Sequence, residues 1–157
     1  MHESFRQYAD SLDPLFQRLI QMPPVTIAAL PEDVPSQGIY LFSENGRHLY
    51  VGRTQRQSIR VRMRQHCVPS ARQNEAVFAF KLAREMTGRL QPSYTVKGSR
   101  KMLEVDPEFR TAFLQAKERV RNMELRYVEV SDPLRQTLLE IYVGVVLKTS
   151  YNDFDTH

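Results

Sequence analysis

The sequence has only one cysteine, Cys67, in 157 residues. A single thiol excludes an internal disulfide framework and a zinc site built from several cysteines. It is typical of a protein from a reducing compartment, so we expect a cytoplasmic location. The sequence also lacks a run of about 18 apolar residues, which excludes a membrane-spanning helix and predicts no membrane partner. Residues 1–10 lack the apolar stretch of a secretory signal.

Acidic residues are missing from residues 45–74, although the whole chain carries 18 of them and its formal net charge is only +4. The same stretch holds seven arginines: Arg47, Arg53, Arg56, Arg60, Arg62, Arg64 and Arg72. Clustered charge usually marks a solvated helix face, but such faces normally intersperse glutamates. Because guanidinium groups match phosphate oxygens, we favour a surface that contacts phosphates. The arginines expected to contact nucleic acid are Arg53, Arg56, Arg60, Arg64 and Arg72.

Two β-rich runs, residues 38–42 and 48–52, flank Glu44-Asn45-Gly46 and predict a β-hairpin. A two-residue loop would place Tyr40 and Tyr50 on opposite faces of the hairpin. A three-residue loop places them opposite each other and separates aliphatic from aromatic side chains. Since a slip of one residue turns every side chain to the other face, the cleaner separation should prevail. We therefore predict the three-residue loop, with both tyrosines off the core face.

Hydrophobic periodicity and capping residues predict an α+β fold, with a small three-stranded antiparallel sheet flanked by helices. The third strand is expected over residues 125–130. The predicted helices cover residues 3–21, 59–67, 75–86, 107–122 and 133–148. Residues 89–106 are expected to form an irregular basic loop. We assign residues 1–32 to a helical N-terminal arm and residues 33–157 to the main domain, with a helical insert at about 67–124.

The predicted helix over residues 133–148 is apolar nearly all round, so we expect it to be largely buried. Glu140 is the one acid inside it. A buried carboxylate is costly unless a cation or strong donors compensate it. Either a salt bridge to an arginine or a bound divalent metal would do so, and the chemistry of the helix alone leaves both open.

Several short motifs occur in an order that resembles the GIY-YIG nuclease family. In chain order they are Gly38-Ile39-Tyr40, Tyr50-Val51-Gly52, Arg62 to His66, Glu140 and Asn152. The first motif matches letter for letter, and the second has valine for isoleucine. Taken singly, a tyrosine is more often a strand aromatic, and an asparagine after a helix is often a turn residue. The ordered set carries the resemblance, over roughly residues 37–66 and 125–154.

The resemblance implies a metal-dependent endonuclease that hydrolyses DNA phosphodiester bonds and leaves 5′-phosphate and 3′-hydroxyl ends. Members of the family use one divalent ion, so Glu140 is expected to hold Mg²⁺ or Mn²⁺. Tyr40 or Tyr50 is expected to position and deprotonate the attacking water. A phenol has a pKa near 10, so this role needs cationic neighbours, which the arginine cluster could provide.

Three further residues take roles from the same resemblance. Arg62 is expected to brace the phosphate in the transition state. His66 is expected to orient a tyrosine or assist proton transfer, and Asn152 to support the site by hydrogen bonding. The expected partner is DNA, in double-stranded form. A homodimer remains an option, since a double-strand cutter with one site needs two copies.

Departures from the family pattern leave some alternatives open. Where many relatives have lysine after the second motif, this chain has Arg53, whose geometry differs. About two extra residues precede Arg62, so Arg60 is a rival for its role. The main alternative function is a catalytically inactive nucleic-acid-binding module on the same fold. A protein-interaction domain is a third reading. The insert could grip DNA, or serve packing or a dimer surface.

Overall fold

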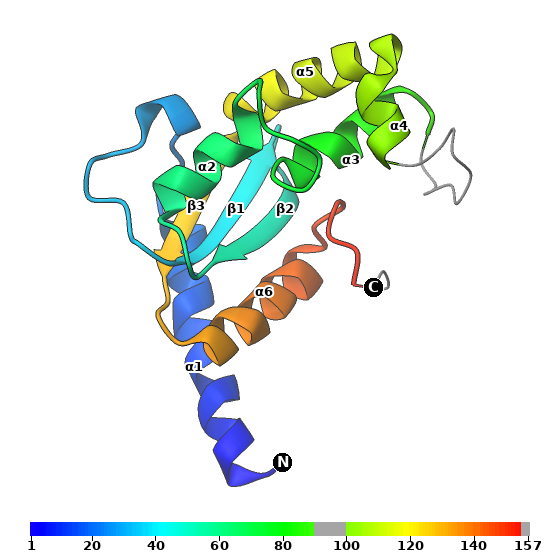
Figure 1. Cartoon of the computed structure of the whole chain (residues 1–157). Helices are drawn as coiled ribbons and strands as arrows, with labels where there is room; N and C mark the ends of the chain where they lie inside the picture. Colours follow the sequence, from blue (N-terminus) through cyan, green and yellow to red (C-terminus); the bar gives the residue numbers. More distant parts are fainter. Residues whose placement is uncertain (90–99, 155–157) are drawn as a thin grey trace. The chain divides into compact units, whose positions relative to one another are not determined.

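The computed structural model describes residues 1–89 and 100–154. These residues form an α+β fold with six α-helices and a three-stranded antiparallel sheet of order β2-β1-β3 (Figure 1). The sheet predicted from the sequence is thereby confirmed. The chain divides into two compact units, one of residues 1–62 with 123–157 and the other of residues 63–122. None of the helices in the described part of the chain is long and apolar enough to cross a membrane.

The first unit contains the whole sheet, with β1 (Gly38–Glu44) in the middle, β2 (Arg47–Thr54) at one edge and β3 (Glu124–Glu129) at the other. Its long helices are α1 (Glu3–Gln21) and α6 (Pro133–Leu147), and a short 3₁₀ helix, η1, spans Ile27–Ala29. The start of α6 follows from its sequence. Asp132 accepts a hydrogen bond from the amide of Arg135 at 2.8 Å, and Pro133 occupies the first turn.

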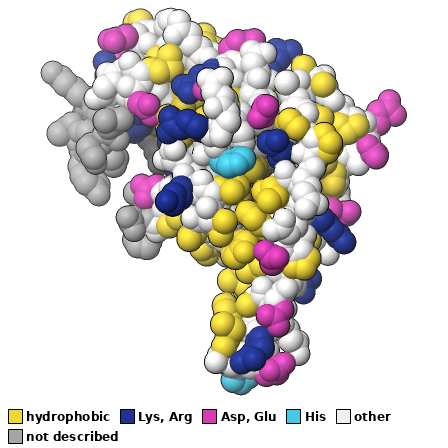
Figure 2. Space-filling view, turned by 180° about the vertical axis from the view of Figure 1, so that it is seen from behind, with side chains coloured by type: hydrophobic (Ala, Val, Ile, Leu, Met, Phe, Trp, Pro, Cys, Tyr) yellow, Lys and Arg dark blue, Asp and Glu magenta, His cyan; other side chains and the backbone are white. Residues whose placement is uncertain are grey.

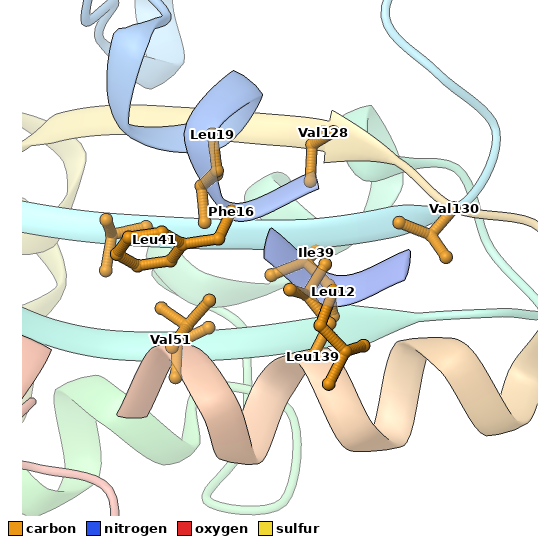
Figure 3. Packing of buried hydrophobic residues seen from close by; sticks show 10 residues of the cluster. Leu12, Phe16, Leu19, Ile39, Leu41, Val51, Val128, Val130 and Leu139 are labelled. Atoms are coloured by element: carbon orange, nitrogen blue, oxygen red, sulfur yellow. The ribbon is translucent and has the colours of Figure 1, made fainter. Parts of the chain in front are cut away.

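Both long helices pack on one face of the sheet, which we call the core face (Figure 3). Helix α1 contributes three side chains and α6 two, and the remaining members come from the sheet and its end. The buried cluster consists of Leu12, Phe16, Leu19, Ile39, Leu41, Val51, Val128, Val130, Leu139 and Val143. The helix predicted near the N-terminus is present, and its second half belongs to this core.

The hairpin between β1 and β2 differs from the predicted register. Asn45 and Gly46 have φ values of 52° and 76°, which is typical of a two-residue type I′ turn. The register shifts between Phe42 and Ser43, because Phe42 pairs with Tyr50 but Ser43 pairs with His48. Leu49 is the extra residue of this β-bulge. The predicted three-residue loop, with Tyr40 opposite Tyr50, is therefore wrong.

The bulge nevertheless keeps both tyrosines on one face of the sheet. Tyr40 pairs with Gly52 and Phe42 with Tyr50, so these four residues share the face opposite the core face. We call it the site face. Its part on β1 is buried, since Tyr40 is only 1% exposed and Phe42 is fully buried.

Gly38 opens β1 where the neighbouring strand comes very close. A Cβ at this position would lie 2.1 Å from the carbonyl oxygen of Val128, so any side chain would push β3 away. The first glycine of the motif thus has a structural reason in this chain: it allows β1 and β3 to pair at this end of the sheet.

The second unit is helical. Helix α2 (Ile59–Cys67) starts in the first unit, where the hydroxyl of Ser58 caps it through the amide of Val61, and ends in the second. It is followed by α3 (Val77–Met86), α4 (Arg100–Val105) and α5 (Pro107–Arg121). Helix α4 corrects the expectation of an irregular loop over 89–106, of which residues 90–99 lie outside the described residues.

Aromatic rings form the interior of this second unit. Phe80, Phe109 and Phe113 contact one another, with ring centroids 5.0 to 6.1 Å apart. Lys117 lies over the Phe113 ring and donates hydrogen bonds to the carbonyl oxygens of Pro69 and Ala71. The unit covers nearly the same residues as the insert expected from the sequence.

Candidate active site

Tyr40 lies on the middle strand, directly across from Gly52 on the edge strand. A Cβ at Gly52 would lie 2.3 Å from the Tyr40 hydroxyl oxygen and 2.4 Å from the ring carbon that bears it. The ring therefore passes over β2 where the glycine leaves room for it. The second motif glycine thus brings the hydroxyl of a central-strand tyrosine toward the free edge of the sheet.

Arg62, in the first half of α2, lies beside this hydroxyl. Its Nε atom donates a hydrogen bond to the Tyr40 hydroxyl oxygen over 3.3 Å. The rival arginine points elsewhere, since Arg60 donates to the carbonyl oxygen of Pro31. The structure therefore brings Arg62, and not Arg60, to the tyrosine.

Tyr50 lies on the same face and interacts electrostatically with Tyr40, Arg62 and Glu140. Burial raises its pKa above the usual value, and the nearby Tyr40 phenol acts in the same direction. Burial also raises the pKa of Tyr40, and this effect outweighs the opposite effect of Arg62. Arg62 thus favours the phenolate form of both tyrosines, as expected of a cationic neighbour, but burial has the larger effect on their pKa values in the protein alone.

Glu140 lies on α6 and forms an ion pair with Arg53 of β2, with 3.1 Å between Arg53 Nε and Glu140 Oε2. The charge of Glu140 raises the pKa of both phenols. Burial raises the pKa of Glu140, while Arg53 acts in the opposite direction. Both explanations of this acid thus remain: it has an arginine partner, and it lies in the electrostatic neighbourhood of the tyrosine pair.

The expectation of a largely buried α6 is wrong. Leu134, Ile141 and Val145 are exposed on this helix, and the Glu140 side chain is 24% exposed. Apolar residues all round a helix do not prove burial, because exposed apolar side chains are common on protein surfaces. The partial exposure leaves the Glu140 carboxylate accessible to water.

Asn152 follows α6 and is tied to the free edge of β2. Its side-chain amide donates to the carbonyl oxygen of Val51 and accepts from the Val51 amide, both at 2.8 Å. The Tyr151 amide donates to the carbonyl oxygen of Leu49 at 2.9 Å. Asn152 thus pairs with the strand between Tyr50 and Gly52.

Gln136 is a residue of this site that the sequence analysis missed. It is fully buried on α6, one turn before Glu140. Its amide nitrogen donates to the carbonyl oxygens of Val130 and Thr54, the latter one residue beyond Arg53. A polar residue one helical turn from Glu140 in an apolar helix was the available signal.

His66 is buried in α2, one turn after Arg62, and belongs to the second unit. Arg64 and Arg72 are exposed in the same unit. Arg56 is exposed in the loop between β2 and α2 of the first unit. The groups gathered within the first unit are therefore Tyr40, Tyr50, Arg53, Arg62, Glu140 and Asn152.

A second polar pair lies at the other end of the hairpin. The Ser43 hydroxyl and His48 Nδ1 are 2.8 Å apart. Burial lowers the pKa of His48, and Arg126 adds to this effect. Ser43 is only 1% exposed, so a substrate cannot reach its hydroxyl in this conformation. We therefore assign the pair to the structure of the hairpin.

A metal ion at Glu140 would have to take most of its ligands from water. Among the described residues, no group of three or more histidine, cysteine, aspartate or glutamate side chains could hold a metal ion. Mg²⁺ is often bound through one or two carboxylates and keeps several waters. The accessible Glu140 carboxylate meets that requirement, with Arg53 as its competitor.

Comparisons with known proteins give no family assignment. No protein-family model, no curated protein and no solved structure matches the chain. The resemblance to GIY-YIG nucleases therefore stays a prediction that rests on the motif residues and their positions.

Proposed function

We propose that the protein is a divalent-metal-dependent endonuclease of the GIY-YIG type, acting on double-stranded DNA. One arrangement carries the proposal: the two tyrosines lie on one face of the sheet, Arg62 donates a hydrogen bond to Tyr40, and the charge of Glu140 acts on both phenols. They come from the hairpin, the start of α2 and the middle of α6. Packing of the fold alone does not require two phenols and a guanidinium close to a partly exposed carboxylate.

In the proposed reaction a water molecule attacks the phosphorus, and the bond to the 3′ oxygen breaks. The water supplies a hydroxyl to the 5′-phosphate and a proton to the 3′-hydroxyl product. Arg62 binds a phosphate oxygen as negative charge builds up. The phenols of Tyr40 and Tyr50 are protonated at neutral pH, so they first orient the water by hydrogen bonding.

Glu140 is the residue that would hold the Mg²⁺ or Mn²⁺ ion. The ion would polarise the phosphate, stabilise the leaving oxygen and, by its charge, lower the pKa of the neighbouring phenols. Asn152 holds the strand that carries Tyr50. The exposed arginines Arg56, Arg64 and Arg72, together with Arg60, would contact the DNA backbone outside the reacting phosphate.

The charge distribution on the surface bears on the proposed DNA contacts. On the face shown in Figure 2, acidic and basic side chains of the described residues are interspersed around a hydrophobic area. The described Lys and Arg side chains drawn there thus have acidic side chains among them. DNA contacts through the arginines of residues 53–72 therefore remain part of the proposal.

Plasmid nicking tests the proposed function. The full chain should nick supercoiled plasmid with Mg²⁺ and lose this activity in EDTA. Glu140→Ala should reduce nicking at least about a hundredfold, because it removes the one carboxylate that is proposed to hold the metal. Glu129→Ala is the matched control, since this acid is exposed at the far edge of the sheet and should nick normally.

The Arg53–Glu140 ion pair favours one alternative, a catalytically inactive nucleic-acid-binding module, because it satisfies the acid without a metal. That alternative predicts DNA retention that falls steeply with salt and does not change with magnesium or Glu140→Ala. A protein-interaction domain predicts no salt-dependent retention. Double-strand cleavage would also require two copies of the chain, and sedimentation in the presence of DNA would test for them.

A further inference from the structure

Arg53 and Glu140 neutralise each other in an ion pair. The inference drawn from this pair rests on the proposed function. Metal and phosphate each need one member of the pair: the metal needs the Glu140 carboxylate, and a phosphate matches the Arg53 guanidinium. We propose that Arg53 exchanges Glu140 for a nucleic-acid phosphate when the metal binds, so that metal and nucleic acid bind cooperatively.

The geometry makes the exchange feasible. The contact is a single one, from Arg53 Nε to Glu140 Oε2 at 3.1 Å. The two side chains are 37% and 24% exposed, so both can be reached by a ligand from solution. Ion pairs with this much exposure contribute little to stability. A dication or a phosphate can therefore replace either partner without unfolding the site.

A side-chain contact between α6 and β2 keeps the two residues in register during such an exchange. Gln136, one turn before Glu140, donates to the carbonyl oxygen of Thr54, the residue after Arg53. This contact fixes α6 against the end of β2. The exchange then needs only side-chain movement, and the long arginine side chain can swing while the carboxylate stays in place.

Charge explains why the two ligands should help each other. Metal alone would leave the Arg53 cation next to a dication, and phosphate alone would leave the Glu140 carboxylate facing an anion. With both ligands present, each charge has an opposite partner. Coupling of this kind is reciprocal, so metal should tighten nucleic-acid binding by the factor by which nucleic acid tightens metal binding.

The first test measures Mn²⁺ binding to the full chain without nucleic acid, from the electron paramagnetic resonance signal of the free ion. Arg53→Ala should bind Mn²⁺ about fivefold more tightly than the unchanged protein, the scale expected for a partly exposed ion pair. Arg47→Ala, which removes the same charge at the other end of β2, should stay within about twofold. Glu140→Ala should lose the site.

The second test measures retention of a short DNA duplex in EDTA, where no metal is present. Glu140→Gln should bind the duplex more tightly than Glu129→Gln, although both remove one negative charge from the first unit. The additional affinity for the duplex would come from the Arg53 side chain, which no longer pairs with a carboxylate at position 140.

The outcomes separate this proposal from the proposed function. If the unchanged protein nicks plasmid but Arg53→Ala and Arg47→Ala bind Mn²⁺ equally, the exchange is wrong and the nuclease remains. Equal duplex retention by the two glutamine variants would likewise overturn the exchange. If no Mn²⁺ binds at Glu140 and no plasmid is nicked, both proposals fail.

Discussion

The two faces of the central sheet use different chemistry. The core face is aliphatic along the sheet, with Ile39, Leu41, Val51 and Val128 packed under α1 and α6. The site face carries aromatic side chains and a glycine: Tyr40, Phe42, Tyr50 and Gly52. Alternating residues of the same two strands thus serve two purposes. One set packs in the core, and the other carries the two tyrosines of the candidate site.

The comparison extends to α6, where neighbouring residues differ in burial and in chemistry. Leu139 is fully buried in the core cluster, and Glu140 is partly exposed beside Arg53. Hydrophobic burial has little directional preference, whereas interactions of charges and hydroxyls depend on geometry. Substitutions in the core cluster should therefore affect stability, and substitutions at the candidate site should affect activity. The following predictions test that separation.

The largest effect is expected on the core side. Leu139→Ala should lower the free energy of unfolding by about 3 kcal/mol, because it leaves a cavity between α6 and the sheet. Denaturant unfolding measures the loss. Glu140→Ala should change the unfolding free energy by less than about 1 kcal/mol while it removes nicking. Equal destabilisation by both variants would contradict the division.

Gly52→Ala should act on the site side. The added methyl group would overlap the Tyr40 hydroxyl, so the ring must move away from Arg62. Displacing a positioned group by about 1 Å can reduce a rate about a hundredfold, and we expect a loss of nicking on this scale. Gly46→Ala is the control. Its positive φ should cost stability, but no atom lies within 4 Å of the added methyl group, so activity should persist.

Gln136→Leu should have an intermediate effect on both stability and activity. It leaves the carbonyl oxygens of Val130 and Thr54 without their buried donor, which should cost about 1–3 kcal/mol of unfolding free energy. It should also loosen Glu140 relative to Arg53, so the apparent Mg²⁺ requirement for nicking should change. Thr137→Val is a matched control, because Thr137 is only half-buried and its hydroxyl bonds within its own helix. A metal requirement that matches this control would contradict the positioning role.

The smallest effect concerns alkaline pH. The folded protein raises the pKa of Tyr40, whereas the unfolded chain ionises near pH 10. The associated stability is therefore complete below about pH 10 and is lost as the pH rises above it. Tyr40→Phe should lose less unfolding free energy than the unchanged protein between about pH 9 and 11. Parallel pH profiles for the two proteins would contradict the raised pKa.

Local signals in the sequence were enough for much of the fold. The capping aspartates Asp106 and Asp132, each followed by proline, marked the starts of α5 and α6 correctly. The hairpin was found, but its register was not. A turn of Asn45 and Gly46 with a bulge at Leu49 keeps the tyrosines on one face as a longer loop would, and the pattern of side chains cannot distinguish the two.

The sequence named most of the residues that are gathered in the first unit, but it did not predict their contacts. Arg53 faces α6 because it pairs across from Ile39 on the core face, and this depends on the bulge. Its partnership with Glu140 joins residues 87 positions apart. The choice of Arg62 over Arg60 depends on their partners in the fold, the Tyr40 hydroxyl for Arg62 and the Pro31 carbonyl oxygen for Arg60. Tertiary geometry of this kind is not encoded in local spacing.

The pairing of Asn152 with Val51 also matters for the solution behaviour of the protein. An outer strand with open amides and carbonyls is a template for another chain, and β-sheet proteins often aggregate through such strands. Here a side-chain amide occupies one donor and one acceptor of β2, much as an added strand would. Replacing Asn152 should therefore expose unpaired backbone groups at the edge of β2 and promote fibril-like assembly.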